Sequence, residues 1–177
     1  MKEQRGSNIQ VAGRDTDQRG FRAGPVSGTL GGAMLLQSVT AEAYPGFDRI
    51  VFGCAPLRSL AGRASTYAVS ADAPPFSSHG SGDPLAIDGR AFLRVDFLEV
   101  YAHDPERPRQ AVSPSLVLYP GLGVVAEICR SDDTGGYVEL VIGLSRGAQW
   151  RVSELADPPR LIVDIENRIT IARVGAA

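Results

Sequence analysis

The segment from Tyr137 to Ile165 restricts the fold more than any other part of the sequence. Apolar residues occupy every second position after Tyr137, which predicts a strand with one buried face. The side chains expected to point inward are Val138, Leu140, Ile142 and Leu144, and those expected to point outward are Tyr137 and Glu139. Ser145-Arg-Gly-Ala148 predicts a turn into a second strand. Asp157-Pro-Pro-Arg160 predicts a break before a third strand, because each proline disfavours helix at the residue that precedes it.

Further short strands are predicted along the rest of the chain, with turn residues between them. They cover residues 35–43, 47–54, 65–70, 92–101, 123–129, 149–153, 161–165 and 168–174. The 20 glycines and 12 prolines among 177 residues suit a chain with many turns. Apolar residues do not recur at helical spacing over several turns. We therefore expect an all-β fold at residues 34–174, a two-sheet β-sandwich of about ten short, mostly antiparallel strands.

The first part of the chain, residues 1–33, carries few apolar side chains. Such a composition buries too little surface to offset the entropy lost on ordering. We expect a disordered N-terminal tail over residues 1–33, with Gly28–Gly32 as a hinge into the domain. No apolar run has the length of a signal peptide core or a transmembrane helix, and no lipobox is present. The sequence therefore leaves the localisation open.

Charge and cysteine content narrow the class of protein. A formal net charge of −2 and a pI of about 5.7 leave no basic surplus to neutralise a phosphate backbone, so nucleic acid is not an expected partner. The two cysteines, Cys54 and Cys129, are too few for a zinc site. Two interpretations stay open for them: a pair of buried free thiols, or one cross-strand disulfide.

No group of residues has the spacing of a catalytic or metal site. His79, Ser81 and Asp83 lie close together in the sequence, but Ser81 is not in the strand–turn–helix setting of a nucleophile elbow. Asp132-Asp133 stands in a hairpin connection, where acidic side chains commonly bond their own backbone. We expect no catalytic residues, no metal and no cofactor.

A small set of aromatic and charged residues is expected at solvent-facing or edge positions of the strands. The set is Tyr67, Arg94, Tyr137, Glu139, Trp150 and Arg151. Exposed aromatic rings beside arginines are typical of a groove for a carbohydrate or a peptide. The same pattern also arises from ordinary cross-strand pairs that stabilise a sheet. The sequence supports both interpretations.

Four stretches, taken in order, resemble the AMIN-like domain of actinobacterial secreted proteins and lipoproteins. They are Gly46–Phe52; Gly80–Pro84 with Gly89–Val95; Tyr119–Glu127; and Val138–Leu144 followed by Trp150 and Asp157–Asp164. The resemblance covers about residues 36–166. That family is similar to the AMIN domain, a β-sheet module that localises envelope amidases and secretins. The signal or lipobox cysteine and the Thr/Pro-rich linker usual in the family are absent here.

The resemblance implies a non-enzymatic, extracytoplasmic module with peptidoglycan or another envelope glycan or protein as its partner. Two other functions remain open at this stage. The long loops at residues 72–89 and 102–114 could form the walls of a small-molecule or hydrolytic site, which would use His79 or His103. A cytosolic protein-interaction domain would follow if the chain is not exported.

Overall fold

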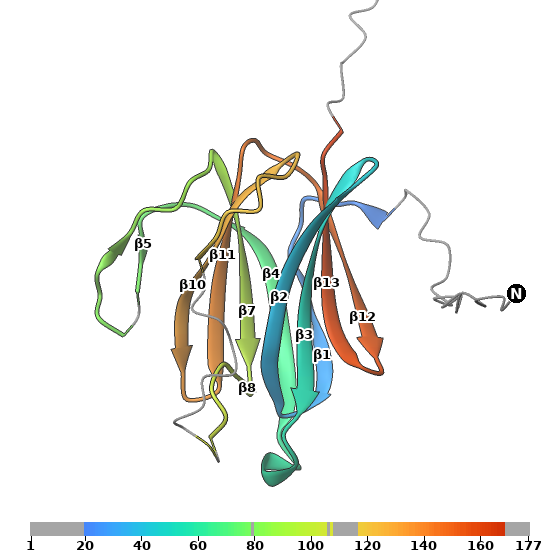
Figure 1. The fold of residues 1–177 in the computed structure, drawn as a ribbon, viewed down its shortest axis with the longest axis vertical. Coiled ribbons are helices and arrows are strands. Elements are labelled where there is room, and N and C mark those ends of the chain that lie inside the picture. The colour runs from blue at the N-terminus through green and yellow to red at the C-terminus, as the bar shows by residue number, and fades with distance from the viewer. Residues whose placement is uncertain (1–19, 79, 106, 108–116, 169–177) are drawn as a thin grey trace, which may run out of the picture.

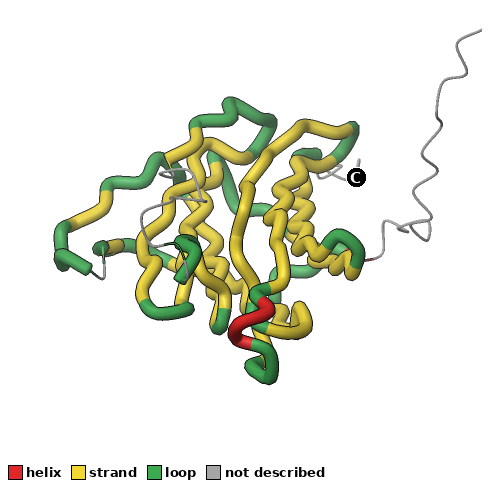
Figure 2. The backbone as a smooth tube through the Cα atoms, turned by 60° about the horizontal axis from the view of Figure 1, so that its bottom comes forward, coloured by secondary structure: helices red, strands yellow, loops and turns green. Residues whose placement is uncertain are grey.

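The computed structural model describes residues 20–78, 80–105, 107 and 117–168, and this part of the chain is all-β, as predicted. It also contains a 3-10 turn at Arg58–Leu60 (Figure 2). The strands are β1 (Val26–Gly32), β2 (Met34–Tyr44), β3 (Phe47–Pro56), β4 (Ala64–Asp72), β5 (Phe76–Ser77), β6 (Pro84–Leu85), β7 (Ala91–Leu98), β8 (Val100–Tyr101), β9 (Val117–Leu118), β10 (Val125–Thr134), β11 (Tyr137–Leu144), β12 (Trp150–Ala156) and β13 (Pro159–Glu166).

The strands form two main sheets that lie face to face (Figure 1). One sheet has the order β1-β4-β7-β11-β10-β9, and we call it the six-stranded sheet. The other has the order β12-β13-β3-β2-β8, and we call it the five-stranded sheet. Within the described residues, the pairing of β2 with β8 is parallel and the remaining strand pairs are antiparallel. The sandwich predicted from the sequence is confirmed.

The hydrophobic core lies between the two sheets, and period-two alternation selects its residues. On β11 the inward side chains are Val138, Leu140, Ile142 and Leu144, as predicted. Phe52 of β3 meets Phe97 of β7 edge to face across the sheets, with ring centroids 5.4 Å apart. Because both rings are fully buried, this contact fixes how the sheets face one another.

The buried carboxylate of Asp48 joins the two sheets at one end of the core. Asp48 lies on β3, and its Oδ2 accepts hydrogen bonds from the backbone N–H groups of Val124 and Val125, at 2.6 and 3.0 Å. Its Oδ1 accepts a third bond, 2.7 Å long, from the side-chain amide of Asn167. Asp48 is fully buried, so a single side chain holds the chain leading into β10 against the end of β3.

Residues 73–78 and 80–90 belong to an arm that carries the two-stranded sheet β5-β6 and projects beside the six-stranded sheet (Figures 1 and 2). Phe76 of the arm packs on Phe92 of β7, with ring centroids 4.9 Å apart. The returning chain then lies directly on β11, where a Cβ added at Gly143 would collide with the backbone carbonyl of Asp88. A glycine at this position therefore allows the arm to rest on the sheet.

The segment from residue 20 to residue 32 corrects the domain boundary predicted from the sequence. Instead of continuing the tail, it passes from one sheet to the other. The backbone N–H and C=O groups of Arg22 bond those of Trp150 on β12, both at 2.9 Å, and β1 then pairs with β4. Its short polar residues predicted a tail and hinge, but pairing with β4 supplies hydrogen bonds that composition does not reveal. The rest of the predicted tail, residues 1–19, lies outside the described residues.

Both cysteines are free and buried, so the structure does not contain the disulfide considered from the sequence. Cys54 belongs to the core on β3, whereas Cys129 lies on β10 outside the core cluster. Cys54 points into the core from the five-stranded sheet, whereas Cys129 lies on the six-stranded sheet outside the core cluster, so the two thiols are too far apart for the short Cβ separation of a disulfide. Burial raises the pKa of the Cys54 thiol to about 12 and also raises that of Cys129.

Candidate functional site

The outer face of the five-stranded sheet carries a row of charged side chains that crosses three strands. Register places Arg49 of β3 opposite Asp164 of β13, and Asp164 opposite Arg151 of β12. Arg49 donates to both carboxylate oxygens of Asp164, at 2.7 and 2.9 Å, and Arg151 donates from Nε to Oδ2 at 2.9 Å. Asp164 is 2% exposed, so the two guanidinium groups neutralise a buried charge. The hydrogen bond to Asp164 raises the pKa of Arg49.

Aromatic rings flank this row on both sides. Tyr44 and Phe47 stack in parallel at the β2–β3 turn, with centroids 5.2 Å apart. The Arg49 guanidinium lies 5.2 Å from each of these two rings. Arg151 lies 4.6 Å from the ring of Phe21 and 5.1 Å from that of Phe47. We call the surface formed by Phe21, Tyr44, Phe47, Arg49, Arg151 and Asp164 the aromatic–arginine face.

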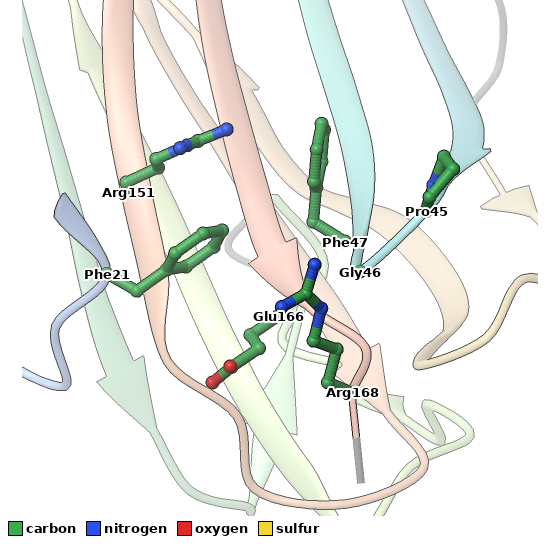
Figure 3. Close-up of a pocket in the computed structure, with 7 residues that line it drawn as sticks. All are labelled: Phe21, Pro45, Gly46, Phe47, Arg151, Glu166 and Arg168. Carbon is green, nitrogen blue, oxygen red and sulfur yellow. The ribbon is translucent and has the colours of Figure 1, made fainter. Parts of the chain in front are cut away.

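A hollow of about 240 Å³ opens beside Phe47 at the end of this face (Figure 3). Its walls come from four separate parts of the chain: Phe21 before β1, the β2–β3 turn, Arg151 of β12, and Glu166 with Arg168 at the end of β13. Figure 3 shows Arg151 reaching toward Phe47 and the guanidinium of Arg168 rising toward Gly46. The hollow thus combines aromatic rings with cationic groups, a combination suited to a sugar or an anion.

Gly46 determines where Arg168 lies. Its φ of 93° is in the left-handed region that glycine adopts readily. A Cβ at this position would approach the Nε of Arg168 to 2.5 Å, so only glycine leaves room for the guanidinium against the turn. The Arg168 carbonyl also accepts a hydrogen bond of 3.2 Å from Arg146, and the nearby Asn167 is held by Asp48. These bonds fix the backbone at Arg168, from which its side chain extends to the hollow.

The outer face of the six-stranded sheet carries a second polar cluster. The Tyr137 hydroxyl lies 2.7 Å from Asp96 and 2.9 Å from Glu139, and a hydroxyl can donate to only one of these carboxylates at a time. Ser131 donates to Glu139 at 2.5 Å. Arg94 lies 3.4 Å from Asp96 and 3.9 Å from Glu139. Burial raises the pKa of Asp96, and burial together with these hydrogen bonds raises that of Tyr137.

The structure divides the six residues predicted from the sequence into three groups. Arg94, Tyr137 and Glu139 meet on the outer face of the six-stranded sheet, although Glu139 is only 5% exposed. Arg151 belongs to the aromatic–arginine face, on the opposite side of the sandwich.

A solvent-facing position is wrong for Tyr67 and Trp150, since both are buried in the core cluster, although Trp150 does belong to the edge strand β12. Trp150 pairs with Ile165, whose side chain faces the core, and Tyr67 donates to Glu154 of β12 at 2.5 Å. The pairing partners determine which face a short strand buries, and the local sequence of these two strands does not show it.

The loops considered for a hydrolytic site are only partly described. His79 and most of residues 102–114 lie outside the described residues. A polar hollow of about 200 Å³ lies between the arm and the β10–β11 hairpin, with Ser78, Arg130 and Asp133 among its lining residues. His103 Nδ1 lies 3.4 Å from Asp133, and the Thr134 hydroxyl donates to the side chain of Asp132 at 2.7 Å, beside the β10–β11 turn.

Several residues of the aromatic–arginine face were not identified from the sequence. Phe47 and Arg49 alternate with buried residues on β3, so a signal for them was present. Asp164 is an acid among the apolar residues 161–165, which is also a usable signal. Phe21 lay in the predicted tail and Arg168 at the start of the predicted strand 168–174, and no local pattern marks either of them as part of a site.

Comparison with known proteins gives one match. The family model described as the AMIN-like domain matches residues 34–167, which is most of the chain. No curated protein and no solved structure matches it. In the part of the chain that the structure describes, no helix has the length and apolar character needed to cross a membrane.

Proposed function

The chain belongs to the AMIN-like domain family, and on that premise we propose that it is a non-enzymatic binding module of the cell envelope. Its partner in this proposal is peptidoglycan, and its contact surface is the aromatic–arginine face. Family membership supports a role in binding or localisation. The choice of surface is supported by the geometry of the five-stranded sheet.

One observation carries the proposal: stacked rings and buried ion pairs together form a preorganised outer face. Tyr44 is 37% exposed and stacks on Phe47, so part of an aromatic surface is accessible to a sugar ring. The bonds of Asp164 to Arg49 and Arg151 hold the guanidinium groups against the rings. A rigid surface loses little conformational entropy on binding, which favours affinity.

Sedimentation of the full chain with purified peptidoglycan sacculi tests this proposal. The wild-type protein should sediment with sacculi, and Tyr44→Ala should weaken binding by about tenfold, the loss typical of an exposed aromatic anchor. Leu98→Ala is the matched control, because Leu98 is an exposed apolar side chain, 54% accessible, on the six-stranded sheet. It should bind as the wild type does.

Two results would count against the proposal. If the wild-type protein stays in the supernatant at every concentration of sacculi, the chain is not a peptidoglycan-binding module. If Leu98→Ala weakens binding as much as Tyr44→Ala, the contact is not made through the aromatic–arginine face. Circular dichroism of both variants shows that the comparison is made between folded proteins.

A further inference from the structure

The hollow beside Phe47 contains charged groups that the protein itself does not pair. Arg151 forms an ion pair with Asp164 and lies against the rings of Phe21 and Phe47, so its guanidinium forms part of the wall of the hollow. Among the described residues, neither Arg168 nor Glu166 forms an ion pair, although both line the hollow. Arg168 is exposed at the opening, and its guanidinium lies against Gly46 of the β2–β3 turn. Its planar group of donors is therefore available to a ligand.

We propose that this hollow is a subsite for one sugar residue that carries a carboxylate, with the carboxylate bound by Arg168 and the sugar ring packed against Phe21 and Phe47. The inference rests on the proposed function, because it places one unit of an envelope glycan at the end of the aromatic–arginine face. It adds the chemical class of that unit and the residues that select it.

The balance of charge in the lining favours an anion. Arg49 and Arg151 share the single acid Asp164, and Arg168 faces the single acid Glu166, so the group at the hollow carries one positive charge in excess. An adjoining, more open hollow shares Glu166 and Arg168 and adds Arg146, so cationic groups continue beyond the first unit. A guanidinium binds a carboxylate through two parallel hydrogen bonds, which fixes the orientation of the ligand as well as its charge.

The size of the hollow suits one ring. Its volume of about 240 Å³ lies just below the range of about 300–1,000 Å³ in which drug-sized ligands bind. The shared wall with the adjoining hollow gives the next unit of a polymer a path along the surface. Glu166 lies on that shared wall, where its like charge would oppose an anionic ligand.

Two of the three side chains that the proposal assigns to the ligand lie outside the part of the chain that matches the family. The match covers residues 34–167, whereas Phe21 precedes it and Arg168 follows it. Phe21 is positioned by the two backbone hydrogen bonds between Arg22 and Trp150. The proposed contacts with the ligand therefore include residues on both flanks of the matched range.

Isothermal titration of the full chain with three tetrasaccharides tests the proposal. Chitotetraose is neutral; the alternating N-acetylglucosamine–N-acetylmuramic acid tetrasaccharide without peptides adds lactyl carboxylates; tetragalacturonate carries its carboxylates on the ring. We expect at least one acidic probe to bind about tenfold more tightly than chitotetraose, the ratio expected from one charge-assisted hydrogen-bond pair. The acidic probe that binds more tightly identifies where the carboxylate is attached.

Variants separate the charge from the ring contact. Arg168→Gln should abolish the preference for the acidic probe and leave the affinity for chitotetraose unchanged. Phe21→Ala should lower the affinity for all three tetrasaccharides by a similar factor. Glu166→Gln should raise the affinity for the acidic probe. Arg160→Ala is the control: Arg160 is also exposed on β13, six residues from Glu166, or about 20 Å along the strand. It should behave as the wild type.

The subsite is rejected if neither acidic probe binds more tightly than chitotetraose, or if Arg168→Gln keeps the preference. If no tetrasaccharide binds while sacculi still retain the protein through Tyr44, the subsite is wrong and the proposed function stands. If sacculi do not retain the protein at all, the proposed function fails with it.

Discussion

Replacing Asp48 with alanine should destabilise the domain by about 3–5 kcal/mol, because two buried N–H groups lose their acceptor. The Oδ2 atom of Asp48 accepts from Val124 and Val125, and both of these residues are 0% exposed. Each unsatisfied buried donor costs about 1–3 kcal/mol, and the bond to Asn167 is lost as well. A water molecule entering the vacated space would bring the cost toward the lower end.

The matched variant is Asp48→Asn, which keeps the shape of the side chain. Because a single oxygen accepts both backbone bonds, the amide carbonyl can replace it. The amide nitrogen then faces Asn167, whose side chain can turn to present its oxygen. We expect this variant to lose about 1–2 kcal/mol, close to the value of one hydrogen bond.

Urea denaturation, monitored by tryptophan fluorescence, measures the free energy of unfolding of both variants. The chain has one tryptophan, Trp150, which is 2% exposed and therefore reports unfolding. The slope of free energy against urea should stay constant while the midpoint falls. The loss in Asp48→Ala corresponds to a fall in melting temperature of about 6–20 °C for a domain of this size. A loss below 1 kcal/mol, or equal losses in the two variants, would refute the reasoning.

Three further outcomes follow from the structure. Gly143→Ala should prevent folding or lower the unfolding midpoint sharply, measured by the same urea titration, since the arm lies against its Cα; an unchanged midpoint would contradict this contact. Cys54 and Cys129 should both react with a thiol reagent in denaturant without reductant and resist it in the folded protein, and fewer than two thiols would show a disulfide. Because burial raises the pKa of Asp96 above its ordinary 3.8, the folded state binds that proton more tightly than the unfolded state. Wild-type stability relative to Asp96→Asn should therefore fall as pH rises from 3.8 through the folded pKa, and a difference that does not change with pH would disprove it.

The fold could be predicted from local sequence because apolar and polar residues alternate along most of the strands. The inward face of β11, from Val138 to Leu144, follows from alternation alone. The faces buried by Tyr67 and Trp150 depend on partner strands, so the sequence around them gave the wrong side. The candidate site needed long-range information, since Arg49 and Asp164 lie 115 positions apart and meet only through the register of β3 and β13.

The passage of residues 20–32 from one sheet to the other also changes which strand forms the edge of the six-stranded sheet. β1 covers the edge of β4 and becomes the outer strand in its place, where a register shift between Thr29 and Gly31 interrupts the ladder, and Arg22 pairs with β12 at Trp150. A shortened protein that began at residue 34, where the family match begins, would leave the whole of β4 as a bare edge. Exposed strands of that length act as templates for the strands of other molecules. We therefore expect a protein that lacks residues 20–32 to aggregate more readily than the longer chain, because it exchanges the short, interrupted edge of β1 for the longer edge of β4.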